Sequence, residues 1–246
     1  WLLFTDVDCK PPVTWIKEMA EFFTDEVDYV IGMSSVIPDG SLVSNFQSID
    51  FQMLMAASYA QAIKGSPWAC TGQNQAYRKS LFNKVDGFKY LSNLLQGDDS
   101  VFMQICRHSG ARIIPALTKN PMVARTEKDL ISLLKQRMRW AGDSKYMIKL
   151  CPTFFIASVI TYITNIGLLF FLYEYRYIFI FLSLFILYKL GIEYSLYYTF
   201  IKINKLKNIK IINWLQWFCL QVPYIIIVGS MSFSAHKLFG WKNNKA

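Results

Sequence analysis

Residues 1–8 read Trp-Leu-Leu-Phe-Thr-Asp-Val-Asp, an apolar run that ends in two aspartates. The apolar part, residues 1–5, predicts a buried strand. Because side chains alternate across a strand, carboxylates at positions 6 and 8 would point to the same face of its end. Such pairs are typical of Mg²⁺ or Mn²⁺ sites, where substrate phosphates and water fill the remaining positions. Chance alone produces Asp-x-Asp about 0.5 times in this chain, so the pair alone is a weak signal.

The rest of the first 150 residues alternates between short strands and helices. Strands are expected at residues 29–36, 68–71 and 111–117, and helices at about 11–23, 45–64, 98–108 and 127–150. This alternation predicts a layered α/β domain. The last helix combines apolar side chains with six lysines and arginines. That composition favours a helix lying in the headgroup region of a membrane.

The remainder of the chain has the composition of a membrane segment. Residues 151–246 carry 9 Lys and Arg against 2 Asp and Glu, whereas residues 1–150 carry 17 against 15. Basic residues that flank apolar segments indicate a membrane protein and argue against a nucleic-acid binder, whose basic residues would gather on a soluble face. Spans of the ~20 apolar residues that a crossing helix needs are expected at residues 151–173, 177–201 and 211–233. The third contains Pro223, so a re-entrant segment stays open beside a full span.

Charged residues within and between these segments add two expectations. Lys189 and Glu193 lie four residues apart in the second segment, on one helical face where they can pair. They are either a structural pair facing neighbouring helices or a polar group lining a substrate path. Residues 202–210 hold four lysines and no acid. The positive-inside rule therefore places this loop, and with it residues 1–150, in the cytoplasm.

A second acidic pair, Asp98-Asp99, follows Gly97 at the start of a predicted helix. Aspartate at this position is usually a cap that satisfies free N–H groups. Alternatively, one of the two carboxylates is kept ionised by the helix N-terminus and takes a proton from an attacking hydroxyl as a general base. The sequence leaves both interpretations open.

Residues 136–140 read Gln-Arg-Met-Arg-Trp. From the composition of the chain, Gln-x-x-Arg-Trp is expected about 0.008 times by chance, so it is a far more specific signal than Asp-x-Asp. Arginine can hold a diphosphate through two parallel hydrogen bonds. The apolar face of an indole can stack on a sugar ring. The pattern thus offers residue types that can bind a diphosphate and a sugar.

Taken in order, these motifs resemble those of the membrane-bound family 2 glycosyltransferases, which include cellulose synthase and poly-N-acetylglucosamine synthase catalytic subunits. The stretch at residues 71–79, Thr-Gly-Gln-Asn-Gln-Ala-Tyr-Arg-Lys, is also similar to the family's Thr-Gly-x-Asn-x-Ala-x-Arg-Lys. The resemblance implies the C-terminal half of a GT-A type α/β domain over residues 1–126 and transmembrane helices over residues 151–246. Between them, residues 127–150 would form an amphipathic interfacial helix.

The resemblance also implies a role for each motif residue. Asp8 would be the main metal ligand, Asp6 would contact metal or donor, and Asp99 would be the catalytic base. Donor and acceptor would be bound by Asp6, Gly72, Asn74, Asp98, Gln136, Arg139 and Trp140. The implied reaction is inverting transfer from a nucleoside-diphosphate sugar to a glycan or lipid acceptor with Mg²⁺ or Mn²⁺ as cofactor. The protein would be integral to the cytoplasmic membrane, in contact with the lipid bilayer and without a nucleic-acid partner.

Two departures from the family pattern matter. The acidic pair is Asp-Asp where the family often has Glu-Asp. The nucleotide-binding βαβ units that precede Asp-x-Asp in the family are not found before Asp6. The chain is therefore expected to be the C-terminal part of a longer protein and to be inactive alone. Two alternatives stay open: a transferase that adds one sugar to a membrane lipid, and a non-catalytic membrane subunit or truncated fragment.

Overall fold

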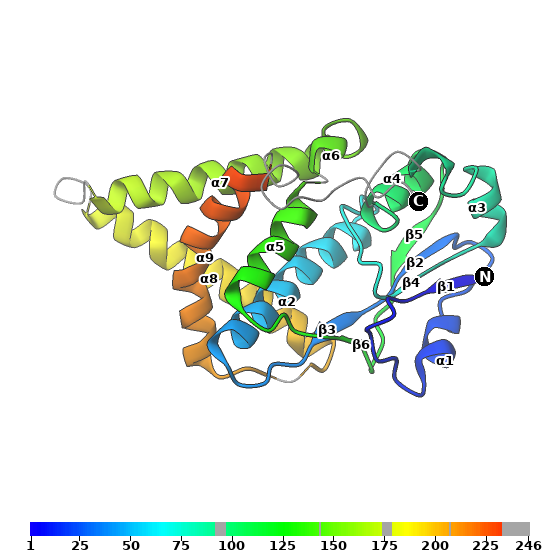
Figure 1. Ribbon diagram of the computed structural model, residues 1–246, viewed down its shortest axis with the longest axis horizontal. Helices are drawn as coiled ribbons and strands as arrows, with labels where there is room; N and C mark the ends of the chain where they lie inside the picture. Colours follow the sequence, from blue (N-terminus) through cyan, green and yellow to red (C-terminus); the bar gives the residue numbers. More distant parts are fainter. Residues whose placement is uncertain (92–96, 143, 174–178, 207, 233–246) are drawn as a thin grey trace.

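The α/β part of the protein is built on two small sheets. A computed structural model describes residues 1–91, 97–142, 144–173, 179–206 and 208–232 (Figure 1). The larger sheet has four strands in the order β1 (Leu2–Phe4), β4 (Gln75–Tyr77), β2 (Tyr29–Ile31) and β5 (Ile113–Pro115). The smaller sheet pairs β3 (Ser34–Val36) with β6 (Met122–Ala124) in parallel. Both parallel and antiparallel pairs occur, so the expected α/β class is confirmed as one with mixed sheets.

Strand direction brings two of the motif segments to one edge of the larger sheet. Strand β4 is antiparallel to both β1 and β2, so β1 and β2 run the same way. The chain leaves β1 at the edge where β4 begins, because Leu2 pairs with Tyr77 and Phe4 pairs with Gln75. Residues 6–8 therefore leave the sheet at the same edge at which residues 71–74 enter it.

The described part of the α/β domain contains five short α-helices and one long helix, α2. They are α1 (Trp15–Ala20), α2 (Leu42–Ile63), α3 (Lys79–Lys84), α4 (Ser100–His108), α5 (Leu130–Ala141) and α6 (Ser144–Leu150), with a 3₁₀ turn at Lys89–Leu91. Helix α2 begins at Ser41, whose hydroxyl accepts the Ser44 N–H at 3.2 Å. Its buried residues lie all around the helix, because α2 packs on β3 and β5 as well as on the later helices α8 and α9.

Several expected elements differ in the structure. Residues 68–71 are not a strand, because the backbone N–H and C=O of Cys70 both bond to the Ser100 hydroxyl, at 3.1 and 2.9 Å. The strand expected at residues 29–36 is divided between the two sheets at Gly32, where the Asn74 side chain occupies the space that a Cβ would fill. The helix expected at residues 127–150 is divided into α5 and α6. Strands β4 and β6 and helix α3 were not expected.

Three long apolar helices follow: α7 (Pro152–Tyr173), α8 (Phe179–Ile203) and α9 (Ile211–Ser232). Each is long and apolar enough to cross a membrane. Helix α7 extends away from the sheets, α8 runs back from its far end to α2, and α9 lies beside α2 and α5 (Figure 1). Helix α9 runs through Pro223 without a break.

The membrane helices and the α/β domain share a hydrophobic core. Phe46 and Ile49 of α2 and Leu133 of α5 belong to one buried cluster with residues of α8 and α9. The α8 and α9 members are Tyr197, Ile201, Trp214, Trp217 and Phe218. We call this cluster the seam. Because its members come from both parts of the molecule, the α/β domain is packed against α8 and α9 and not merely tethered to them.

The expected ion pair of α8 is confirmed. Lys189 Nζ lies 2.6 Å from Glu193 Oε1. Glu193 Oε2 also accepts a hydrogen bond from Gln221 Nε2 of α9 at 2.6 Å. Both carboxylate oxygens thus have a partner within the helices, which is the arrangement of a structural pair facing a neighbouring helix.

Candidate active site

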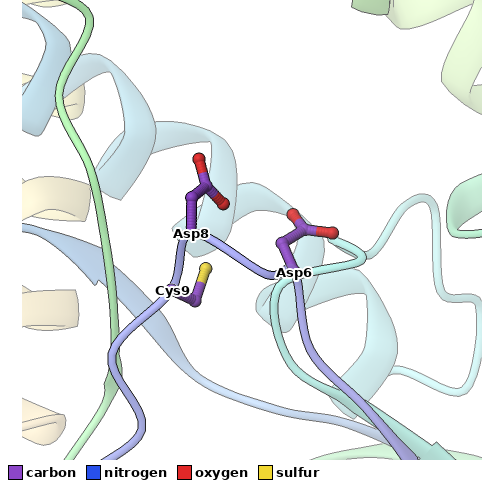
Figure 2. A group of neighbouring side chains, drawn as sticks. All are labelled: Asp6, Asp8 and Cys9. Atoms are coloured by element: carbon purple, nitrogen blue, oxygen red, sulfur yellow. The ribbon is translucent and has the colours of Figure 1, made fainter.

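The aspartates after β1 lie in a turn. The Cys9 N–H donates to the Asp6 carbonyl at 3.1 Å, which closes the turn over Val7. Carboxylate oxygens of Asp6 and Asp8 and the Cys9 sulfur all lie within 4.8 Å of one another (Figure 2). The two carboxylates are close together, as expected, but the turn and not the alternation of a strand end brings them together.

The donor atoms at this turn fit a hard divalent cation. Asp6 and Asp8 are exposed and supply carboxylate oxygens, which Mg²⁺ and Mn²⁺ prefer. Burial and the neighbouring Asp6 and Asp8 carboxylates raise the pKa of the Cys9 thiol to about 11. Because only a thiolate is a good metal ligand, Cys9 is a poor one at neutral pH. Two carboxylates with open positions around them suit a cation that also binds phosphate and water.

Negative charge is concentrated around Asp6. Burial raises the pKa of its carboxyl group, the charges of Asp8 and Asp98 raise it further, and the charge of Arg139 lowers it. Asp98 precedes α4 and Arg139 lies on α5, so residues from three separate motifs act on one carboxylate. A cation bound here would relieve the repulsion among these acids.

Gly72 lies between the two acidic motifs. A Cβ added to it would be 3.4 Å from Asp6 Oδ1 and 3.9 Å from the Cβ of Asp99. The segment before β4 thus runs between the turn after β1 and the start of α4. A side chain at position 72 would contact both acids, whereas glycine leaves that space free.

The second acidic pair is held at the start of α4. Gly97 has φ +120°, a conformation that favours glycine, and its carbonyl accepts the Phe102 N–H at 2.9 Å. The Gln75 side chain donates to the Asp98 carbonyl at 3.1 Å. Asp99 is the N-cap of α4, and its carboxylate accepts the Ser100 N–H. Asp99 is thus a cap that also lies beside Gly72, so the cap and general-base interpretations are compatible.

The Gln-x-x-Arg-Trp residues lie on α5, which begins at the N-cap Asp129. Arg139 acts electrostatically on Asp6, as described above. Gln136 instead donates to Glu127 Oε1 at 2.8 Å and accepts from Arg137 Nη1 at 3.1 Å. The partly buried Trp140 ring lies over the Arg137 guanidinium, whose Cζ is 4.1 Å from the ring centroid.

Asn74 is not brought together with the acids. It is only 1% exposed. Its Oδ1 accepts from Trp15 Nε1 and its Nδ2 donates to the Met33 carbonyl, both at 2.9 Å. These bonds join α1 to the link between β2 and β3, so Asn74 supports the segment that carries Gly72.

Three residues with a large part in this arrangement were missed by sequence reasoning. They are Asp50 of α2, Arg137 of α5 and Tyr224 of α9. Asp50 Oδ2 lies 2.9 Å from Arg137 Nε and accepts the Tyr224 hydroxyl at 3.2 Å. The available signal was an aspartate between Ile49 and Phe51, since an acid buried among apolar side chains is rarely without a partner. Burial raises the pKa of Asp50, and the charge of Arg137 opposes that effect.

Comparison with known proteins gives the family. The family model described as Glycosyl transferase family 21 matches residues 1–245. No curated protein was found to match the chain. The motifs resemble those of family 2, to which family 21 is related within the GT-A superfamily, so the match corrects the family and keeps the superfamily. The chain belongs to glycosyl transferase family 21 and is a glycosyltransferase of an inverting family.

Proposed function

We propose that the protein transfers a single sugar from a nucleoside-diphosphate donor to a hydroxyl of a membrane lipid, with inversion at the anomeric carbon. The observation that carries the proposal is the position of Gly72: a Cβ added to it would contact both Asp6 Oδ1, at 3.4 Å, and the Cβ of Asp99, at 3.9 Å, so the two acids flank one glycine. An inverting displacement needs charge neutralisation at the leaving diphosphate and a base at the attacking hydroxyl. Both groups must act on one anomeric carbon, which requires them to lie close together.

A lipid acceptor is favoured over a soluble one. Family 21 is ceramide glucosyltransferase-like. In addition, the seam packs the α/β domain directly on α8 and α9, two of the candidate membrane spans. A site attached in this way stays near the bilayer, where the polar end of a lipid is presented. A glycan acceptor, which the family 2 resemblance also implied, has no such support from the seam.

The chemistry can be assigned to the residues of this chain. Asp6 and Asp8 would hold Mg²⁺ or Mn²⁺, which supplies charge neutralisation for the departing diphosphate. Asp99 takes the proton of the lipid hydroxyl as the oxygen attacks the anomeric carbon. The bond from that carbon to the diphosphate breaks, and the diphosphate leaves with the electron pair. Arg139 binds the diphosphate through paired hydrogen bonds, Trp140 stacks on a sugar ring, and Asp99 releases its proton to solvent.

We also infer that residues 1–150 face the cytoplasm. The inference rests on residues 202–210, four of which are lysines, at the end of α8 and in the link from α8 to α9. Cytoplasmic loops carry the excess of lysine and arginine in membrane proteins. The same side holds the nucleotide-activated sugars that the reaction needs.

The test is a transfer assay with the full-length protein in lipid nanodiscs. Labelled UDP-glucose, UDP-galactose and GDP-mannose serve as donor probes, with ceramide and diacylglycerol as acceptor probes. We expect labelled lipid in the organic phase from wild type and none from Asp99→Asn. The matched control is Asp129→Asn, which alters the exposed N-cap of α5 but keeps a residue that caps helices well, so it should leave transfer unchanged.

Other outcomes would contradict the proposal. A labelled polymer in place of a labelled lipid would indicate a glycan acceptor. A protein that binds donor but transfers nothing to either acceptor, in wild type as in the variant, would favour the non-catalytic subunit.

A further inference from the structure

Arg137 lies inside the protein, on the helix that carries Gln136, Arg139 and Trp140. It is 3% exposed, although it is one of the two variable positions of Gln-x-x-Arg-Trp. A buried arginine is rare unless it is paired. The partners of the Arg137 guanidinium therefore indicate the role of this residue.

The Arg137 guanidinium contacts two residues of the motif. Its Nη1 donates to Gln136 Oε1 at 3.1 Å, and its plane lies under the Trp140 ring at 4.1 Å. Residues three positions apart on a helix lie side by side, whereas adjacent residues do not face each other. The planar guanidinium reaches both Gln136 and Trp140, because it donates from its edge to Gln136 and lies against the Trp140 ring.

The guanidinium is itself fixed from outside α5. Its Nε donates to Asp50 Oδ2 at 2.9 Å, and the same oxygen accepts the Tyr224 hydroxyl at 3.2 Å. Asp50 belongs to α2 and Tyr224 to α9, so three helices meet at one carboxylate oxygen. Two aromatic contacts flank it: Phe46 packs edge-on against Tyr224 with 5.0 Å between ring centroids, and Phe51 lies 6.4 Å from the Trp140 ring.

We propose that Arg137 is a positioning residue for sugar transfer: it fixes Gln136 and Trp140, and Asp50 and Tyr224 fix Arg137 relative to α9. The inference rests on the proposed function and adds to it that a candidate membrane helix determines the geometry of the sugar-binding helix. Stability is a weak explanation for the ion pair, because apolar pairs of similar volume often replace buried ion pairs without loss of stability. An apolar pair could not orient Gln136 and Trp140, because it offers neither the hydrogen bond to Gln136 nor the cation beside the Trp140 ring.

This difference supplies the test. The double variant Asp50→Leu/Arg137→Met replaces the ion pair with apolar side chains of similar volume. We expect a protein in nanodiscs that melts within a few degrees of wild type, yet has kcat/KM for the lipid acceptor lowered at least about tenfold. Binding of the donor nucleotide UDP or GDP, measured without acceptor, should change much less. A double variant that melts like wild type and transfers sugar with wild-type kinetics would overturn the inference.

A conservative variant covers the case in which the double variant does not fold. Tyr224→Phe removes only the hydroxyl that binds Asp50, and it should raise the acceptor KM about threefold with the melting temperature nearly unchanged. The matched control is Tyr162→Phe, which removes another hydrogen bond to α9, from Tyr162 to Ser230 at 2.7 Å. The same change in acceptor KM in both variants, or in neither, would contradict a specific role of the Asp50 contact.

Arg137→Lys separates charge from shape. Lysine keeps the positive charge beside Asp50 but cannot donate to Gln136 and stack on Trp140 together. We expect it to behave like the double variant in acceptor use. Full activity of the lysine variant would show that charge alone matters. Wild-type protein is measured in the same assay. An inactive wild type would contradict the proposed function. An active wild type together with fully active variants would contradict only the positioning role of Arg137.

Discussion

The molecule contains two carboxylate clusters, one around Asp6 and one around Asp50. Burial raises the pKa of both aspartates. At the sheet edge, the neighbouring carboxylates of Asp8 and Asp98 raise the pKa of Asp6 further. In the interior, by contrast, the Arg137 guanidinium lowers that of Asp50. The first cluster has an excess of negative charge that a cation or a substrate can use. In the second cluster the Asp50 carboxylate is paired with Arg137 inside the protein, so this cluster has a structural role.

Removal of the candidate base should have the largest effect and tests the catalytic role of the first cluster. Asp99→Asn should lower kcat by about 10²–10⁴-fold, the usual contribution of general-base catalysis. Donor affinity should stay near wild type, because the base acts on the acceptor proton. Initial rates and equilibrium binding of the nucleoside diphosphate measure the two effects separately. Asp98→Asn is the neighbouring control and should be milder; the reverse order would assign the base to Asp98.

Removal of the cation should have the next largest effect. Chelation of wild-type protein should abolish transfer, and addition of Mg²⁺ or Mn²⁺ should restore it, because the carboxylates of Asp6 and Asp8 cannot themselves neutralise a leaving diphosphate. Asp8→Ala should show low activity that added metal does not restore. Unchanged activity in both experiments would show that the transfer is independent of a metal at this turn.

The interior cluster should respond in stability. Asp50→Leu leaves the buried Arg137 guanidinium without its carboxylate, and the free energy of unfolding should fall by about 3–5 kcal/mol. Asp6→Leu removes one of several repelling charges and should leave the melting temperature nearly unchanged while it lowers activity. Thermal unfolding in the same nanodiscs compares the two. Similar melting temperatures for both variants would remove the distinction between the clusters.

Helix α5 allows a finer comparison within the site. Trp140→Ala should raise the acceptor KM about tenfold, because it loses a stacking surface for a sugar but no charge. Arg139→Ala should mainly weaken donor binding, through loss of a paired phosphate contact. Steady-state kinetics with each substrate varied in turn separates the two. Equal losses for both substrates in both variants would indicate that α5 is only structural.

Asp39, a carboxylate outside both clusters, should have the smallest effect, and its pKa is lowered and not raised. Hydrogen bonds from Ser44 and Ser41 lower its pKa to about 2. A lowered pKa stabilises the folded state above the unfolded value of 3.8, and this contribution is lost as the pH falls towards 2. Asp39→Asn should therefore melt slightly below wild type at pH 6, and the difference should close near pH 2. A difference that persists at pH 2 would show that ionisation is not its cause.

Much of the fold could be predicted from the sequence because local patterns encode it. The three apolar helices, α2 and α4 were all expected near their observed positions. The failures have non-local causes. Residues 68–71 look like a strand, yet Cys70 bonds to Ser100, thirty residues later. The division of residues 29–36 depends on the Asn74 side chain beside Gly32.

The same distinction applies to the site. The family resemblance implied that the acidic motifs share one site, but the sequence did not predict β4, whose pairing with β1 brings Gly72 beside Asp6. Asn74 could not be separated from them by sequence, since its burial depends on Trp15 and Met33. The Asp50–Arg137 pair joins residues 87 positions apart on two helices, and no periodicity within either helix reports their contact.

The packing of α2 against α9 also constrains the order in which the protein can fold during synthesis. Asp50 and its partner Tyr224 are 174 residues apart in the chain. At a synthesis rate of 5–20 residues per second, α2 leaves the ribosome about 9–35 s before the helix that covers it. During that time Phe46 and Ile49 lack their final neighbours on α9. The catalytic domain can therefore complete its fold only after the last helix is synthesised, which couples maturation of the enzyme to insertion of its membrane helices.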